Sequence, residues 1–168
     1  MEYYAGLAVS TNALAAALMA PIWGSLADRY GRKPMMVRAA FAMIFTMGGM
    51  AFVPNVFWLL VLRVLNGVFT GYIPNSIALI ASQVPKDKTG YALGTLSTGA
   101  VAGNLIGPTL GGVLAEMFGV HTVFLLVGLL YAIVVILTVF YIREDFVPIK
   151  KSDALPVKEV FAQVKDRK

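Results

Sequence analysis

Long apolar runs separated by short polar breaks organise this sequence. Five charge-poor runs occur along it: about Tyr4 to Ala27, Met35 to Val53, Val56 to Ser82, Leu93 to Glu116 and Val120 to Ile142. A helix needs roughly 20 mostly apolar residues to cross a hydrocarbon core of about 30 Å. The pattern predicts an all-α polytopic membrane protein, with five transmembrane helices in residues 1–142 and a polar segment in residues 143–168.

Composition supports a membrane protein and excludes several other classes. Hydrophobic residues make up 58% of the chain and charged residues 14%, whereas soluble domains have about 45–50% and about 25%. Cysteine is absent and His121 is the single histidine, so we expect no disulfide, no metal site and no cofactor. No set of nucleophile, base and orienting acid can be assembled, so we expect no enzyme.

The basic residues predict how the chain crosses the membrane. Of the 14 Lys and Arg residues, 13 lie in alternate breaks or in residues 143–168, and Arg63 alone lies elsewhere. The positive-inside rule then places the amino end outside the cell and residues 143–168 in the cytoplasm. Because the basic residues are divided among membrane loops, we expect no nucleic-acid binding. The carboxyl-terminal tail also has an amphipathic pattern after Pro156, typical of a helix on a membrane surface.

Arg63 is expected to be the only formal charge inside a span. A charge there costs at least about 2.5–3.5 kcal/mol, so it should face the bundle interior or water, or else snorkel outward. Small or polar residues follow on the same helix face: Asn66, Gly67, Thr70, Gly71 and Pro74. Pro74 cannot donate to the Thr70 carbonyl, which leaves a free acceptor in the membrane. The stripe predicts a cavity or a tight helix contact.

Glycines recur every four residues in the fourth run: Gly99, Gly103, Gly107 and Gly111, with Gly112 next to the last. Such a bare face lets another helix backbone approach closely. Pro108 removes the hydrogen bond to the Asn104 carbonyl and favours a kink there. The pattern predicts a packing seam, either one that slides or a static helix contact.

The first polar break begins with an acid in an unfavourable place. Asp28 closes the first run, where the negative end of the helix dipole disfavours an acid by about 0.3–1 kcal/mol. A neighbouring base such as Arg32, or the amino end of another helix, can compensate. Gly24 would allow another helix to come close, and Gly31 gives the turn its backbone freedom.

At these three places the sequence resembles the major facilitator superfamily. Gly24 to Pro34 (GSLADRYGRKP) is similar to the family's loop signature between its second and third helices. Leu59 to Arg63 with Gly67 resembles the fourth-helix signature, although Asn66 stands where Gln is usual. Gly103 to Gly112 resembles the fifth-helix motif of proton-coupled exporters. Overall, the chain looks most similar to multidrug-resistance efflux proteins of the MdtG type.

The resemblance implies a drug:proton antiporter that exports lipophilic compounds by alternating access. The chain would be an incomplete N-terminal half, with helices two to six and the start of the central loop, in the inner (plasma) membrane. Its partners would be the lipid bilayer, small lipophilic substrates, protons and the missing second half.

The resemblance also implies roles for the residues singled out above. Arg63 would take part in proton coupling, and the glycine helix with Asn104 and Pro108 would seal the interface between halves. A conformational latch would use Gly24, Asp28, Gly31 and Arg32. The polar stripes point to Asn12, Asn66 and Thr70 as residues of a substrate cavity.

Two other functions remain open at this point. The same fold could serve a metabolite or sugar uptake carrier, against which the fifth-helix motif argues. The chain could also be a non-transporting membrane module, such as a truncated product or an assembly partner of another helix bundle.

Overall fold

A computed structural model describes the backbone of residues 2–145 and the side chains from residue 6 onward. The amphipathic pattern of the tail therefore lies outside the described residues. The described chain contains six α-helices and no strand: α1 (Glu2–Tyr30), α2 (Arg32–Met50), α3 (Val56–Phe69), α4 (Tyr72–Gln83), α5 (Lys86–Phe118) and α6 (Val120–Tyr141). The predicted all-α class is confirmed.

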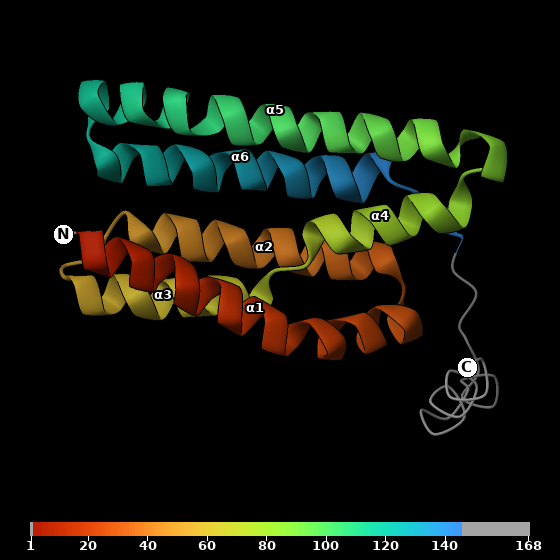
Figure 1. Ribbon diagram of the computed structural model, residues 1–168, viewed down its shortest axis with the longest axis horizontal. Helices are drawn as coiled ribbons and strands as arrows, with labels where there is room; N and C mark the ends of the chain where they lie inside the picture. The colour runs from red at the N-terminus through yellow and green to blue at the C-terminus, as the bar shows by residue number, and fades with distance from the viewer. Residues whose placement is uncertain (1, 146–168) are drawn as a thin grey trace, which may run out of the picture.

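The helices lie side by side along the long axis of the molecule (Figure 1). α5 and α6 form one layer, α2 and α4 lie below it, and α1 and α3 lie beyond them (Figure 1). α2 contacts α1, α3, α4 and α6, whereas α5 contacts only α4 and α6 extensively among the described helices. The second helix is therefore the centre of the bundle, and α5 lies at its edge.

Four stretches are long and apolar enough to cross a membrane: Gly6–Tyr30, Val56–Gln83, Lys86–Phe118 and Val120–Tyr141. α2 is not among them, because Lys33 and Arg38 lie in its first two turns. Its 19 residues nevertheless extend about 28 Å, and it packs extensively against the candidate span α6. We therefore count α2 as the fifth span.

The third predicted span differs from the expectation of one helix. It consists of α3 and α4, separated at Thr70 and Gly71. Gly71 has a φ of +134°, and Pro74 lacks the N–H that would continue the hydrogen-bond ladder to Thr70. These two residues explain why the helix breaks at this position.

Small residues and methionines make up the core. Most of the buried apolar side chains belong to α2: Met35, Met36, Ala39, Ala40, Met43 and Met50. Between α2 and α6 the backbones nearly touch, since a Cβ at Gly128 would lie 3.4 Å from the Gly48 amide nitrogen. Such close contact is typical of membrane helices. Because lipid provides no hydrophobic driving force between helices, they associate through close packing, which small residues allow.

Two side chains fix the turn between α2 and α3. Asn55 accepts a hydrogen bond from the Trp58 amide at 3.2 Å and so caps α3. His121, at the start of α6, bonds through Nδ1 to the Ala51 carbonyl at 2.5 Å. This turn is therefore tied to α6.

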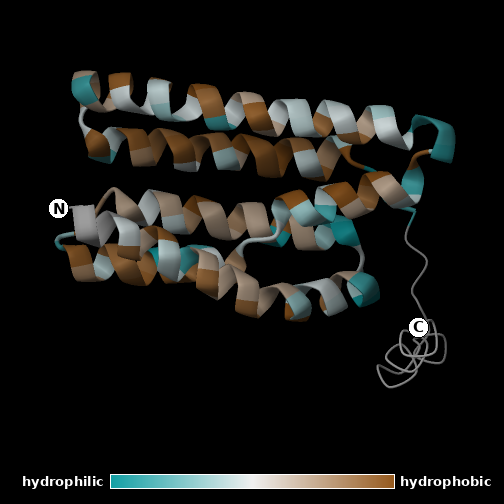
Figure 2. Ribbon diagram, viewed as in Figure 1, coloured by the Kyte–Doolittle hydropathy of each residue, from teal (hydrophilic) through white to brown (hydrophobic). Residues whose placement is uncertain are grey.

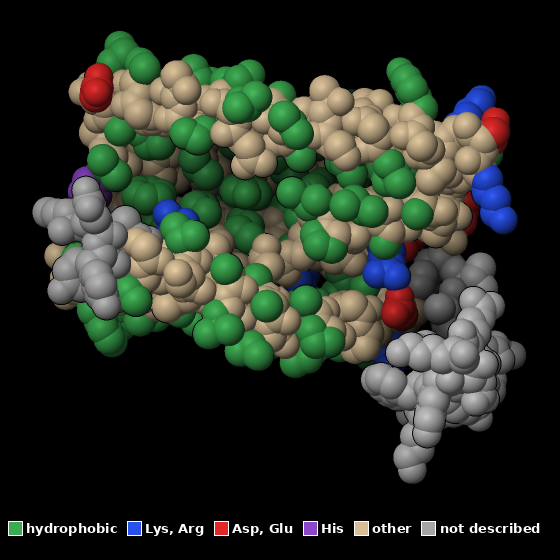
Figure 3. All heavy atoms as spheres, in the orientation of Figure 1, with side chains coloured by type: hydrophobic (Ala, Val, Ile, Leu, Met, Phe, Trp, Pro, Cys, Tyr) green, Lys and Arg blue, Asp and Glu red, His purple; other side chains and the backbone are tan. Residues whose placement is uncertain are grey.

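The outer surface is apolar, as expected of a protein in a bilayer. Large side chains on α5 and α6 are more than half exposed, for example Leu105 at 71%, Leu129 at 61% and Phe140 at 75%. The hydropathy colouring shows α6 as an almost continuously apolar helix, with polar residues near the turns (Figure 2). Charged side chains gather mainly at the ends of the bundle (Figure 3). Exposed apolar surface of this extent is typical of contact with lipid.

Candidate functional site

Asp28 and Arg32 form an ion pair at the junction of α1 and α2. The Arg32 Nη2 donates to Asp28 Oδ1 at 2.5 Å, across one helical turn interrupted by Gly31. Gly31 is the single residue between the two helices and has a φ of +99°. The expectation that a neighbouring base compensates Asp28 is met by Arg32.

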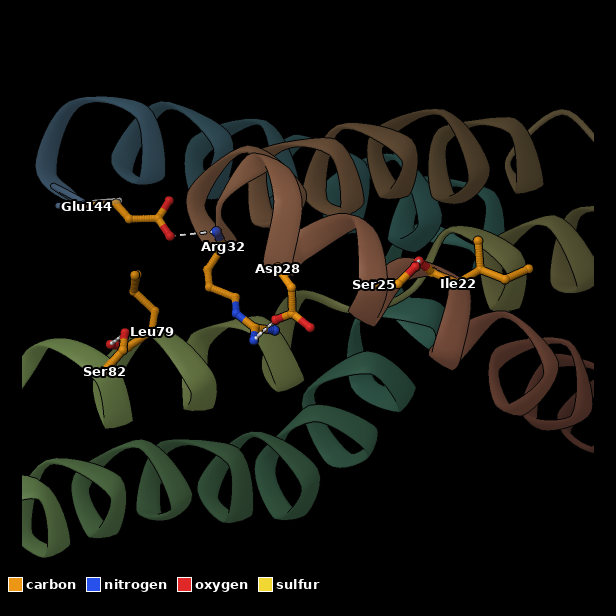
Figure 4. Close-up of polar contacts among 7 residues, drawn as sticks. All are labelled: Ile22, Ser25, Asp28, Arg32, Leu79, Ser82 and Glu144. Atoms are coloured by element: carbon orange, nitrogen blue, oxygen red, sulfur yellow. Dashed lines mark hydrogen bonds and ion pairs between the residues drawn. The ribbon is translucent and has the colours of Figure 1, made fainter. Parts of the chain in front are cut away.

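Glu144, just beyond α6, completes this junction. Its carboxylate accepts hydrogen bonds from the backbone amides of Arg32 at 2.6 Å and Lys33 at 2.8 Å. Lys33 Nζ also donates to the Val139 carbonyl at 2.8 Å. Figure 4 shows Arg32 between the two acids, with its backbone facing Glu144 and its guanidinium facing Asp28. A carboxylate at a helix amino end satisfies free N–H groups and complements the dipole.

Glu144 was not among the residues predicted for this junction from the sequence. The first turn of α2 contains no acid of its own, so its free amides and positive dipole require an anion from elsewhere. This requirement predicts an acidic partner for the start of α2. It does not identify the residue, because Glu144 lies 112 residues from Arg32 along the chain.

The break between α3 and α4 is surrounded by side chains from two other helices. Trp23 of α1 donates from Nε1 to the Val68 carbonyl at 2.6 Å. Arg38 of α2 donates from Nη2 to the carbonyls of Phe69 at 3.4 Å and Thr70 at 3.3 Å. The Arg38 guanidinium carbon lies 3.4 Å from the centre of the Trp23 ring. The free Thr70 carbonyl expected from Pro74 is therefore taken by a side chain.

The expectation that Arg63 is the only charge inside a span is wrong. Arg38 lies within α2, and its Nε and Nη1 are buried without a hydrogen-bond partner in the described residues. Because Arg38 lies near the first basic break, the sequence suggested that it belongs to the solvated cytoplasmic end of the span. The cation–π contact with Trp23 and the carbonyls of the helix break explain why α2 accommodates it.

Arg63 lies in α3, where its side chain is half-buried. Its Nε is inaccessible to solvent and has no hydrogen-bond partner among residues 2–145. The described residues thus leave Arg63 with unused hydrogen-bonding capacity, and its role in proton coupling stays a prediction.

The crossing of α1 and α3 is very close at Gly67. A Cβ there would clash with the Asn12 backbone oxygen and would lie 2.8 Å from Asn12 Oδ1. Asn66, next to it, is 5% exposed and donates from Nδ2 to Thr46 Oγ1 at 3.1 Å and to Met43 Sδ at 2.8 Å. Asn12 and Asn66 therefore contact neighbouring helices, and their part in a substrate cavity stays a prediction.

A cavity of about 250 Å³ lies next to the helix break. Its wall is mostly apolar and comes from α1, the amino end of α2, the break and α4: Ala16, Ala20, Trp23, Gly24, Arg32, Thr70, Gly71, Pro74 and Asn75. Of the three predicted cavity residues, Thr70 lines it, whereas Asn12 and Asn66 do not. Gly24 belongs to its wall, and a Cβ there would meet nothing within 4 Å.

The predicted glycine seam of α5 is in close contact with no described helix. A Cβ added at Gly99, Gly103, Gly107, Gly111 or Gly112 would meet no atom of the described chain within 4 Å. No residue of α5 is buried, and the helix continues through Pro108 without interruption. The glycines of the described bundle that lie against the backbone of another helix are instead Gly67 and Gly128.

Comparisons with known proteins match the chain to one family and to similarly named members. The Major Facilitator Superfamily profile matches residues 2–166. The chain is 63% identical over 165 residues to "Multi-drug resistance efflux pump PmrA" of Streptococcus pneumoniae. It is 60% identical over 167 residues to a PmrA homolog of Lactococcus lactis, and 46% identical over 168 residues to "Multidrug resistance protein MdtG" of Proteus mirabilis.

These alignments include nearly all of the chain but only part of each relative. They cover 98% of this chain against PmrA and 100% against MdtG, while the chain spans 41% and 42% of those relatives. The match of almost every residue to one profile, together with the apolar helical bundle, decides the family. The chain belongs to the Major Facilitator Superfamily and is a multi-pass membrane protein.

Proposed function

We propose that the native polypeptide containing this chain exports lipophilic drugs in exchange for protons. The observation that carries the proposal is the 63% identity to a protein named as a multidrug-resistance efflux pump. It is a transporter and not an enzyme in this proposal, and it works by alternating access about a site within the membrane.

The cavity beside the helix break suits a lipophilic substrate group. Its wall is built mainly from apolar or small side chains, including the Trp23 ring, and Arg32, Thr70 and Asn75 add a few polar atoms. Ligand sites usually combine an apolar wall with few polar groups. In this proposal part of the substrate contacts Thr70, and Asn12 and Asn66 are also residues of the substrate cavity.

Arg63 is the proposed proton-coupling residue. Its permanent charge favours the ionised form of any carboxylate that approaches it, and hence release of a proton from that carboxylate. The unused Nε of Arg63 supports this role. The carboxylate would come from outside the described residues.

The ion pair at the α1–α2 junction is the proposed conformational latch. Gly24, Asp28, Gly31 and Arg32 would hold α1 at the cytoplasmic end, and Glu144 would fix the start of α2 against the end of α6. In this proposal the latch engages a second half of the transporter, and the α5 glycine face, with Asn104 and Pro108, seals against it.

The proposed orientation has the amino end outside the plasma membrane and residues 143–168 in the cytoplasm. It rests on the location of 13 of 14 basic residues and on the positive-inside rule.

Uptake of a lipophilic cationic dye into inside-out membrane vesicles tests this function. Vesicles with the native polypeptide should accumulate the dye when a proton gradient is applied and lose it when a protonophore is added. Sugar counterflow without dye movement would contradict drug export and favour an uptake carrier. Movement of neither compound would favour a non-transporting module.

A further inference from the structure

The backbone carbonyls at the break between α3 and α4 accept hydrogen bonds from side chains of α1 and α2. We propose that α3 and α4 separate and join at Gly71 during transport, and that Arg38 is the positioning residue that supports the Thr70 carbonyl in both states. The proposal rests on the proposed transport function.

In the structure, the separated state is stabilised from outside the broken span. The three consecutive carbonyls of Val68, Phe69 and Thr70 receive hydrogen bonds from Trp23 and Arg38. No backbone amide of the described residues on the α4 side of the break donates to these carbonyls. Because α4 begins at Tyr72, the amides of Tyr72 and Ile73 belong to its first turn and have no acceptor within that helix.

A joined helix would satisfy the same carbonyls differently. The Tyr72 amide would donate to Val68, and the Ile73 amide would donate to Phe69, as in any continuous α-helix. Pro74 still could not donate to Thr70. Arg38 would therefore remain necessary for the Thr70 carbonyl, while the indole of Trp23 and one Arg38 bond would be released.

Because each carbonyl has a donor in either state, neither state leaves a backbone acceptor unpaired in the membrane. Such an acceptor would cost several kcal/mol. Two alternatives of similar hydrogen-bond content are what a bistable element requires.

Gly71 is the residue that makes both states accessible. Its φ of +134° in the separated state is easily adopted only by glycine, and glycine also adopts the helical φ of the joined state. Gly71 and Thr70 also line the cavity together with Trp23. A substrate in this cavity would contact the hinge and the indole that holds it open.

Backbone hydrogen exchange measures this switch directly. The native polypeptide in lipid nanodiscs would be followed at the Tyr72 and Ile73 amides, which are free in the separated state and bonded in the joined state. Two variants disfavour only the separated state. Gly71→Ala strains its φ, and Trp23→Phe keeps an aromatic ring beneath Arg38 but removes the indole N–H.

Each variant has a matched control. Gly94→Ala changes a helical glycine of α5 whose added Cβ would meet nothing within 4 Å. Trp58→Phe changes a tryptophan that is 52% exposed. Arg38→Lys retains a donor for Thr70 but loses the planar guanidinium that stacks on the Trp23 ring.

We expect Gly71→Ala and Trp23→Phe to slow exchange of these amides about tenfold, and to lower kcat for dye export. The two controls should change neither quantity, and Arg38→Lys should retain part of the wild-type export. Unchanged exchange in both test variants would overturn the proposal, as would slowed exchange with an unchanged kcat. If the wild type exports no dye, the proposed function fails, yet the exchange measurement still decides whether the hinge switches.

Discussion

Gly31 is constrained twice, by its backbone and by its surroundings. Its φ is +99°, and a Cβ there would lie 2.8 Å from Glu144 Oε2. We expect Gly31→Ala to lower the free energy of unfolding by about 1–3 kcal/mol, because the new methyl group strains the turn and displaces the carboxylate. Thermal unfolding in detergent measures this loss.

Gly90→Ala is the control for that measurement, because Gly90 is a helical glycine with open space around its Cβ position. A Gly31→Ala protein as stable as the control would show that the turn does not need glycine.

Arg63 carries the prediction about coupling. Arg63→Ala should abolish proton-driven dye export while leaving the amount of protein in the membrane unchanged, because it removes the positive charge that favours proton release from an approaching carboxylate. Arg29→Ala removes an exposed charge at the end of α1 and should retain export. Full export by the Arg63→Ala protein would refute its role in coupling.

At the scale of the helices, we expect substitutions at Gly67 and at the α5 glycines to have different effects on the unfolding temperature. Gly67 lies against the backbone of α1 at Asn12, so Gly67→Ala should force α1 and α3 apart and lower the unfolding temperature. Gly94→Ala, in open space, should leave that temperature unchanged. Equal unfolding temperatures would mean that the close crossing does not stabilise the bundle.

The glycine face of α5 tests the proposed seam between halves. Gly107→Leu should leave the stability of the bundle nearly unchanged, because nothing in the described chain lies within 4 Å of a Cβ there. It should nevertheless slow dye export, since it would block a close approach by another part of the transporter. Val101→Leu, at a position 58% exposed on the same helix, is the control. Unchanged export rates in the Gly107→Leu protein would remove the seam from the mechanism.

Hydropathy predicts the spans because a bilayer imposes a minimum length of apolar helix. The runs from Tyr4 and Val120 correspond closely to α1 and α6. The broken third span was only half predictable: Pro74 reveals a free carbonyl, but whether the helix bends or breaks depends on donors from elsewhere. Those donors, Trp23 and Arg38, come from residues 45 and 32 positions away from their acceptors.

The partners of individual residues were less predictable than the spans. A polar stripe shows which face of a helix is special but does not identify the neighbouring helix. The sequence therefore did not predict that Asn66 contacts α2 and does not line the cavity beside the break. The positive-inside rule does not distinguish a solvated basic residue near the end of a span from one inside the span. Arg38 was therefore expected at the cytoplasmic flank, whereas it lies within α2. Glu144 was missed because its contact joins distant parts of the chain.

At the scale of the whole molecule, the bundle provides a broken span, a mostly apolar cavity beside it and two arginines within spans, all within a family of transporters. Exchange of a drug for protons is the central claim. It requires that the two movements be coupled, which dye accumulation alone does not measure.

The most direct test follows both fluxes in proteoliposomes that contain the purified native polypeptide and a pH-sensitive dye in the lumen. With no imposed gradient, adding a lipophilic cationic drug to one side should move protons in the direction opposite to the drug, and the Arg63→Ala protein should show no such movement. Drug transport without proton movement would contradict antiport.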